Sequence, residues 1–198
     1  ALAAAWVGHG MLSGLPVPLA VAVLLVAGMA AGALLLAGPA FLRLRFGVDE
    51  VVTTLLLNFI VLLFVGMMIE GRLRDPLAFG WPQSVPVDDE LMLGKLVART
   101  RLHMGLVIAI AAAGVVWLIQ ARTVFGLETR AAGLNARAAA FAGINLPRRL
   151  MAVALLSGAL AGLAGAVEVT GLKGYVTTDM SPGYGYAGIV VAMLAALH

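Results

Sequence analysis

Four long apolar runs dominate this sequence of 198 residues. They cover residues 17–42, 51–69, 104–121 and 150–172, and Glu168 is the only charged residue within them. A helix needs about 20 apolar residues to cross a hydrocarbon core of roughly 30 Å, whereas a transmembrane strand needs only about 10. The run lengths therefore predict an all-α, polytopic transmembrane helix bundle, and we treat residues 1–198 as one transmembrane domain.

Composition agrees with a membrane protein and argues against several other classes. Apolar residues make up 62% of the chain and charged residues only 12%, whereas soluble domains carry roughly 25% charged residues. Cysteine is absent, which excludes disulfides and thiolate metal sites. The 13 Lys and Arg residues are dispersed rather than gathered in a basic stripe. We therefore do not expect nucleic acid binding.

The histidines give no support for catalysis or for a metal site. His9, His103 and His198 lie near the ends of predicted helices, and no cluster of acids accompanies them. An intramembrane enzyme needs a nucleophile and a base, or metal ligands, that face one another inside the bundle. We expect this chain to hold no metal and no cofactor and to catalyse no reaction.

Shorter apolar runs lie at both ends of the sequence. Residues 1–12 have the character of the end of an earlier helix, and residues 188–198 that of a helix that has only begun. The sequence starts without methionine, and its last run stops before any polar flank. We expect it to be a fragment of a longer protein.

Two polar segments, residues 70–103 and 122–149, are separated by a single predicted span, so they must face opposite sides of the membrane. Counts of Lys and Arg on the two sides, seven against six, do not decide the orientation. In the second segment, Asn135 is placed to cap a short helix over 136–142 that ends near Gly143. Spacing alone leaves two alternatives for this helix, a plain linker or an element that docks on a partner.

Polar residues inside the spans are candidates for a translocation pathway, because such residues are costly in lipid unless they face protein or water. Asn58 lies near the centre of 51–69, and Thr54 shares its side of the helix. Glu168 lies toward one end of its run. For Asn58 and Glu168, a structural hydrogen bond to another helix is an equally open alternative.

The stretch from Tyr175 to Tyr186 is rich in glycine and tyrosine, and Pro182 interrupts it. We predict a non-helical segment, which membrane depth tolerates only beside protein or a wet cavity, and hence a candidate gate. Its central residues are Ser181, Pro182, Gly183, Tyr184, Gly185 and Tyr186.

Two local motif matches to known ligand sites lack the surrounding residues that those sites require. Gly183, Gly185 and Gly188 satisfy GxGxxG, but no following amphipathic helix or downstream acid completes a dinucleotide site. A potassium filter is not expected, because Ser181 and Pro182 replace the Thr-Val of that motif.

Small-residue pairs, Gly28 with Gly32 and Gly158 with Gly162, indicate faces where helices approach closely.

Several motifs carry a family resemblance. The sequence resembles the ATP-binding cassette permeases that import branched-chain amino acids, ribose and nucleosides in three stretches: FGVDEVVTTLLLNFIVLL at 46–63, GRLRDP at 71–76 and PQS at 82–84. It is similar to the simple-sugar and nucleoside branch in four more: TRLHMGL at 100–106, FGLETRAAGLNARAAAFAGI at 125–144, LLSGALAGLAGAVEVTG at 155–171 and SPGYGYAGIVVAML at 181–194. The match covers nearly the whole chain, in order.

The resemblance implies a multi-pass subunit of the bacterial inner (plasma) membrane, embedded in lipid and paired with a second permease. Cytoplasmic ATP-binding subunits would supply energy, and an extracytoplasmic solute-binding protein would deliver a nucleoside or simple sugar. The resemblance also places residues 122–149 in the cytoplasm as a coupling element formed by Gly133, Leu134, Asn135, Arg137, Ala138, Ala139 and Gly143. The alternative function is an ATP-independent solute facilitator or channel.

Overall fold

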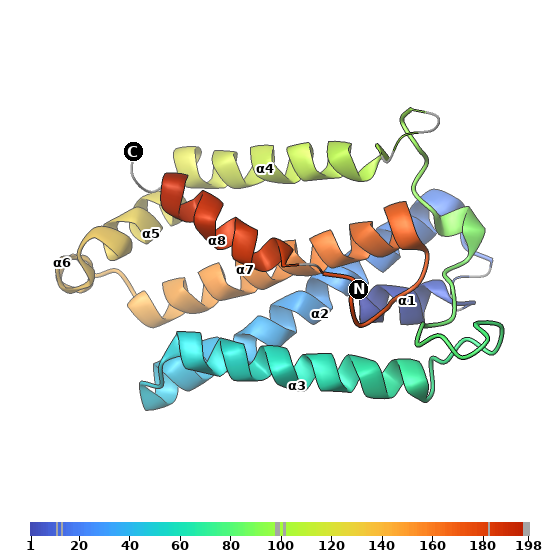
Figure 1. Ribbon diagram of the computed structural model, residues 1–198. Coiled ribbons are helices and arrows are strands. Elements are labelled where there is room, and N and C mark those ends of the chain that lie inside the picture. The colour runs from blue at the N-terminus through green and yellow to red at the C-terminus, as the bar shows by residue number, and fades with distance from the viewer. Residues whose placement is uncertain (11, 13, 98–99, 101, 182, 196–198) are drawn as a thin grey trace.

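The computed structural model describes residues 1–10, 12, 14–97, 100, 102–181 and 183–195, and helices account for most of them (Figure 1). No strand occurs in this described part of the chain, which confirms the all-α prediction. The helices are α1 (Leu2–Gly8), α2 (Val17–Phe46), α3 (Glu50–Glu70), α4 (Gly105–Arg122), α5 (Val124–Leu134), α6 (Ala136–Phe141), α7 (Leu146–Glu168) and α8 (Tyr184–Ala195). A 3₁₀ turn covers Asp89–Leu91, and a π-helical turn, Val169–Lys173, prolongs α7.

Four helices are long and apolar enough to cross a membrane: α2, α3, α4, and α7 together with its π turn. Each lies over one of the four predicted apolar runs. Large apolar side chains such as Leu34, Leu63 and Ile110 are exposed along them. Such surfaces suit contact with lipid or with further helices, as in a multi-pass membrane protein.

The closest helix packing joins α2 to α7 through glycine backbones. A Cβ atom on Gly32 would lie 2.2 Å from the carbonyl oxygen of Gly158, and one on Gly162 would lie 2.1 Å from the carbonyl oxygen of Gly28. Only glycine permits this approach, because any side chain would overlap the backbone of the partner helix. The close approach predicted from the two glycine pairs is confirmed, and the pairs face each other.

One end of the bundle is closed by a small folded region that we call the cap, formed by α1, residues 71–97 and residues 174–180. Backbone hydrogen bonds tie its parts together, from Val87 N to Gly174 O at 2.7 Å and from Asp88 N to Gly8 O at 3.2 Å. Its side chains join those of the spans in one buried cluster that includes Leu24, Ile69, Val87, Leu91, Val169 and Val176.

The opposite end of the bundle carries α5 and α6 (Figure 1). The two polar segments therefore lie at opposite ends, as the alternation of spans and loops predicts. At the same end as α5 and α6, α2 turns into α3 through Gly47, which has a left-handed conformation with φ 68°. Asp49 then caps α3, since its Oδ1 accepts a hydrogen bond from Val51 N at 2.8 Å.

Three local features differ from the sequence predictions. The polar segment 122–149 contains a second helix, α5, that was not predicted. The π turn, which was not predicted, interrupts the regular helix after Glu168, and Gly171 within it lies against the ring of His103. The predicted non-helical segment ends earlier than expected, because Tyr184, Gly185 and Tyr186 form the first turn of α8.

Candidate functional site

Asn135 forms the corner between α5 and α6. Its backbone is extended, with φ −154° and ψ 99°. Its N–H donates to Ala131 O at 3.1 Å and so ends α5, while its side-chain Oδ1 accepts from Ala138 N at 3.1 Å and so caps α6. One asparagine therefore ends one helix and begins the next, as its predicted capping role requires.

The far side of α6 is closed by a second turn. Gly143 has φ 86°, a left-handed conformation that glycine adopts without strain. Two residues later, Asn145 caps α7, since its Oδ1 accepts a hydrogen bond from Arg148 N at 3.2 Å. The chain thus leaves α5, makes less than two turns of α6 and enters a span, with both changes of direction fixed by side-chain or glycine geometry.

The unit from α5 to α6, which we call the α6 corner (residues 124–143), presents large apolar side chains. Phe141 is 97% exposed and Leu134 is 89% exposed. Arg137, which lies between them in the sequence, is also exposed. Of the residues of α6, only Ala139 is buried. A capped, short helix with an aromatic side chain at its end is suited to enter a groove on a partner protein.

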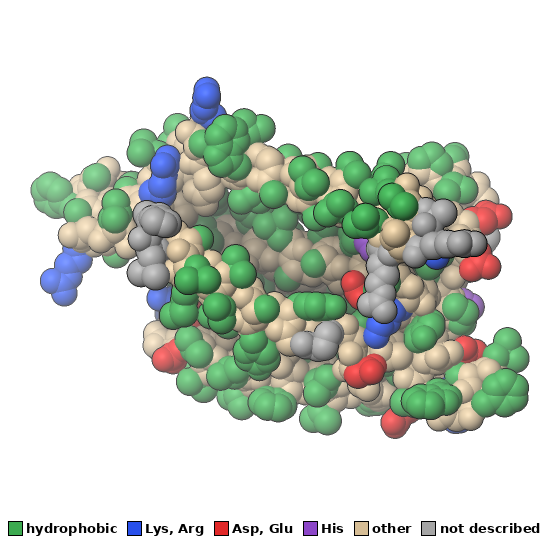
Figure 2. Space-filling model, turned by 45° about the horizontal axis from the view of Figure 1, so that its top comes forward, with side chains coloured by type: hydrophobic (Ala, Val, Ile, Leu, Met, Phe, Trp, Pro, Cys, Tyr) green, Lys and Arg blue, Asp and Glu red, His purple; other side chains and the backbone are tan. Residues whose placement is uncertain are grey.

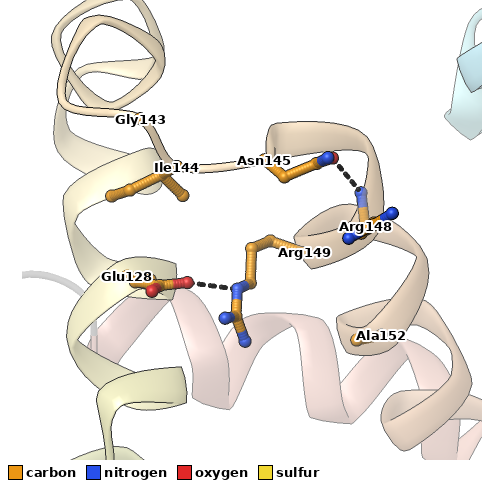
Figure 3. A pocket seen from close by; sticks show the side chains of 7 residues that line it. All are labelled: Glu128, Gly143, Ile144, Asn145, Arg148, Arg149 and Ala152. Carbon is orange, nitrogen blue, oxygen red and sulfur yellow. Dashed lines mark hydrogen bonds and ion pairs between the residues drawn. The ribbon is translucent and has the colours of Figure 1, made fainter.

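A pocket of about 400 Å3 lies behind the α6 corner, where α5 meets the beginning of α7 (Figure 3). Across it, Arg149 of α7 forms an ion pair through Nε with Glu128 of α5. The guanidinium of Arg149 also lies 5.4 Å from the centre of the Phe125 ring, within the range of a cation–π contact. These contacts brace α5, and with it α6, directly against a membrane-spanning helix.

The structure brings together most of the residues predicted for coupling. Leu134, Asn135, Arg137, Ala138 and Ala139 form the α6 corner, and Gly143 ends it. Gly133 lies inside α5, one residue before the end of that helix, rather than in the turn at Asn135. Phe125, Glu128 and Arg149 were missed, although Glu128 is the only acid between residues 122 and 149.

The predicted pathway residues of α3 differ in their surroundings. Thr54 is half-buried, and its hydroxyl donates to the carbonyl oxygens of Glu50 at 2.8 Å and Val51 at 3.0 Å, within its own helix. It lines a cleft of about 850 Å3 together with Arg43, Asp49 and Ile189 of α8. Asn58 is exposed on α3, and its amide has no hydrogen bond within the described part of the chain.

Glu168 and the predicted gate residues do not lie beside Thr54 in the first turns of α3. Glu168 is half-buried at the end of α7 near the cap, whereas Thr54 lies in the first turns of α3 near the opposite end, so the structure does not place them in one site (Figure 1). Ser181 and the two tyrosines, Tyr184 and Tyr186, are exposed, and Gly183 has φ 87°. Pro182 lies outside the described residues. Because Tyr184, Gly185 and Tyr186 are helical, the prediction that they are non-helical is wrong.

Comparison with known proteins identifies one family. The family described as "Branched-chain amino acid transport system / permease component" matches residues 1–198. The guanosine ABC transporter permease protein NupP of Bacillus subtilis is 34% identical over 97% of this chain and 55% of its own length. A nucleoside ABC transporter permease protein, NupB of Lactococcus lactis, is 31% identical over 91% of this chain and 52% of its own length.

A glucose ABC transporter permease protein of Haloferax volcanii is 30% identical over 98% of this chain and 53% of its own length. The chain therefore spans about half the length of the curated relatives it matches. No solved structure matches it.

Proposed function

Because the chain belongs to the permease component family of branched-chain amino acid transport systems, we propose that it is a membrane-spanning subunit of an ATP-binding cassette importer. The four helices of spanning length supply the membrane part of such a subunit. Relatives named as guanosine, nucleoside and glucose permeases support nucleosides or simple sugars as the solute class. The subunit itself carries out no covalent chemistry, and ATP is used only by its partners.

The observation that carries this proposal is the α6 corner. It exposes Leu134, Arg137 and Phe141 at the end of the bundle away from the cap. The Glu128–Arg149 pair and the Phe125 ring connect it to α7. A partner that pushes or pulls on α6 would thereby move a membrane span, which is what conversion of ATPase closure into alternating access requires.

The partners follow from this assignment. Cytoplasmic ATP-binding subunits would receive the α6 corner, a second permease subunit would complete the pathway, and an extracytoplasmic solute-binding protein would deliver solute at the cap end. The membrane would be the bacterial inner (plasma) membrane, with α5 and α6 on the cytoplasmic side. Thr54, Asn58, Glu168 and the segment around residues 181–186 remain proposed pathway or gate positions.

Charge reversal at Arg137 tests the docking role. Arg137→Glu should replace attraction by repulsion at a desolvated contact, which costs up to about a few kcal/mol. In the full-length protein, co-purification of the ATP-binding subunit and solute-stimulated ATP hydrolysis should fall together. Expression and pairing with the second permease should survive, because Arg137 is exposed and lies outside the spans.

Arg72→Glu is the matched control, since Arg72 is an exposed arginine at the opposite end of the bundle. It should leave association with the ATP-binding subunit unchanged. Wild-type coupled ATPase activity in the Arg137 variant, or loss of ATPase association in the Arg72 variant, would show that the docking assignment is wrong. Uptake by the full-length chain in the absence of any ATP-binding subunit would favour the alternative, an ATP-independent facilitator or channel.

A further inference from the structure

The connection that follows α3 displays a concentrated apolar tip. In residues 76–82, which we call the apolar loop, Leu77 is 79% exposed, Phe79 is 98% exposed and Trp81 is 77% exposed. The loop contains no charged residue. Three large apolar side chains that are this exposed within five residues are unusual on a surface that meets only water.

The base of the apolar loop is held firmly. Asp75 is buried, and its carboxylate accepts hydrogen bonds from Leu77 N and Gln83 Nε2, each at 2.9 Å. Ser84 is fully buried and exchanges two hydrogen bonds with Val176, from Ser84 N to Val176 O at 2.9 Å and from Val176 N to Ser84 Oγ at 2.8 Å. The loop is thus fastened to the cap, and its tip is presented outward by a built support.

Phe79 adds a second, independent observation. Its φ is +47°, in the left-handed region that bulky residues rarely adopt and that glycine or asparagine tolerates far better. The Phe79 side chain is almost completely exposed, so packing within the described chain does not compensate for this conformation. A phenylalanine at this position is therefore best explained by a contact that its ring makes outside the chain.

Lipid is the partner that fits the loop's position. The apolar loop begins six residues after the end of α3 at Glu70, and a hydrogen bond from Leu73 N to Met68 O, at 2.8 Å, keeps the chain against the last turn of that helix. Apolar side chains of α3, such as Leu63 and Met67, are exposed up to that turn. In Figure 2 hydrophobic side chains follow the lower edge of the molecule, the side on which α3 lies, and are present again at its lower right end, with acidic side chains between the two groups.

The chemistry of the loop also suits the bilayer interface. Its backbone donors are largely satisfied internally, since Ala78 N bonds to Asp75 O at 3.3 Å and Trp81 N bonds to Ala78 O at 2.9 Å. Tryptophan is enriched at membrane–water boundaries, where its ring enters the apolar layer while its N–H stays hydrated. The exposed Arg72 and Arg74 at the base of the loop can reach lipid phosphates.

From these observations we propose that the apolar loop inserts Leu77, Phe79 and Trp81 into the interfacial layer of the bilayer and anchors the cap end of α3 to the lipid surface. The exposed apolar side chains of α3 and those of the loop would then both contact lipid, with the exposed Glu70, Arg72 and Arg74 between them. Such an anchor would form whichever solute is transported and whether or not an ATP-binding partner is bound.

Tryptophan fluorescence in vesicles tests the anchor. The full-length protein and its Trp81→Phe variant are reconstituted in vesicles of phosphatidylethanolamine and phosphatidylglycerol, with bromine on the acyl chains near the headgroup. The difference in fluorescence between the parent protein and the Trp81→Phe variant is the emission of Trp81. We expect bromolipid to quench this component. Trp117→Phe is the positive control, because Trp117 is 61% exposed on the span α4.

Absence of bromolipid quenching of the Trp81 component would overturn the proposal, and protection of that component only after a soluble protein is added would assign the loop to protein docking instead. A second variant, Phe79→Asn, tolerates positive φ and should leave the melting temperature of the protein unchanged or raised. It should nevertheless reduce bromolipid quenching of Trp81. Unchanged quenching in this variant would remove Phe79 from the anchor.

Discussion

At the scale of single residues, the polar groups of α3 separate into two kinds. The hydroxyl of Thr54 is satisfied by carbonyl oxygens of its own helix, as is common for threonine in membrane helices. The amide of Asn58, one turn further along, is exposed and has no partner among the described residues. A carboxamide in this position of a span needs water, solute or another helix.

This contrast predicts different outcomes for two conservative substitutions. Asn58→Leu should keep expression and assembly of the full-length transporter but reduce solute uptake several-fold, because a polar group of the pathway is lost. Thr54→Val should reduce uptake less than Asn58→Leu does, since the Thr54 hydroxyl already bonds to carbonyl oxygens of α3 itself. Uptake in proteoliposomes, normalised to reconstituted protein, is the measurement.

Two results would contradict the pathway role of Asn58. Parental uptake with full expression would return Asn58 to a position without transport function. Loss of assembly with the second permease would instead indicate an interhelical hydrogen bond, whose removal typically costs roughly 0.6 to 2 kcal/mol.

At the scale of helices, hydrophobic run length predicts the four helices of spanning length, because burial in lipid is a property of whole segments. Short helices and interruptions of long helices are harder to predict. The helix α5 is short and of mixed polarity, and its clearest signal is the Thr123 side chain, which accepts a hydrogen bond from Gly126 N at 3.3 Å. The π turn after Glu168 lies in a tertiary contact, in which the ring of His103 closely approaches Gly171, and such contacts between distant residues are not visible in local sequence.

Some interactions of the candidate site were predicted from the sequence and others were not. Capping by Asn135 is a local interaction, so sequence spacing alone predicts it. The pairing of Glu128 with Arg149 joins two helices, so it emerges only from the packing of α5 against α7. The start of α8 at Tyr184 was missed because glycine, proline and tyrosine so close together normally interrupt a helix in water.

The crossing of α2 and α7 gives a prediction about helix packing. Gly32→Ala should destabilise the protein by about 1–3 kcal/mol, because the new methyl group would lie 2.2 Å from the carbonyl oxygen of Gly158 and the backbone must move. Gly38→Ala is the control on the same helix, since a Cβ there meets no atom within 4 Å. Thermal unfolding of the purified full-length protein should show a lowered midpoint for the first variant only. Equal midpoints would mean that the two helices are not this close in the membrane.

At the scale of the whole molecule, the bundle has two unlike ends. The cap gathers α1 and the long connection between α3 and α4 around buried side chains such as Val87 and Val176. The opposite end exposes a capped helix with Arg137 and Phe141. Charge counts alone do not orient such a chain, because Lys and Arg are divided almost evenly between the two sides. The difference in architecture does orient it, once α6 is assigned to an ATPase.

That orientation leads to a topology prediction that uses the absence of cysteine from these 198 residues. Glu90→Cys places a thiol on the exposed 3₁₀ turn of the cap, and Ala140→Cys places one on the exposed side of α6. In full-length protein whose other cysteines have been replaced, a membrane-impermeant maleimide added to intact spheroplasts should label the first variant. It should label the second only after permeabilisation. Only α4, of the candidate spans, separates the two positions, so labelling of both from outside would mean that α4 does not cross the membrane. Labelling with the two positions reversed would place α6 outside the cell, where no ATP-binding subunit can reach it, and the importer assignment would fail with it.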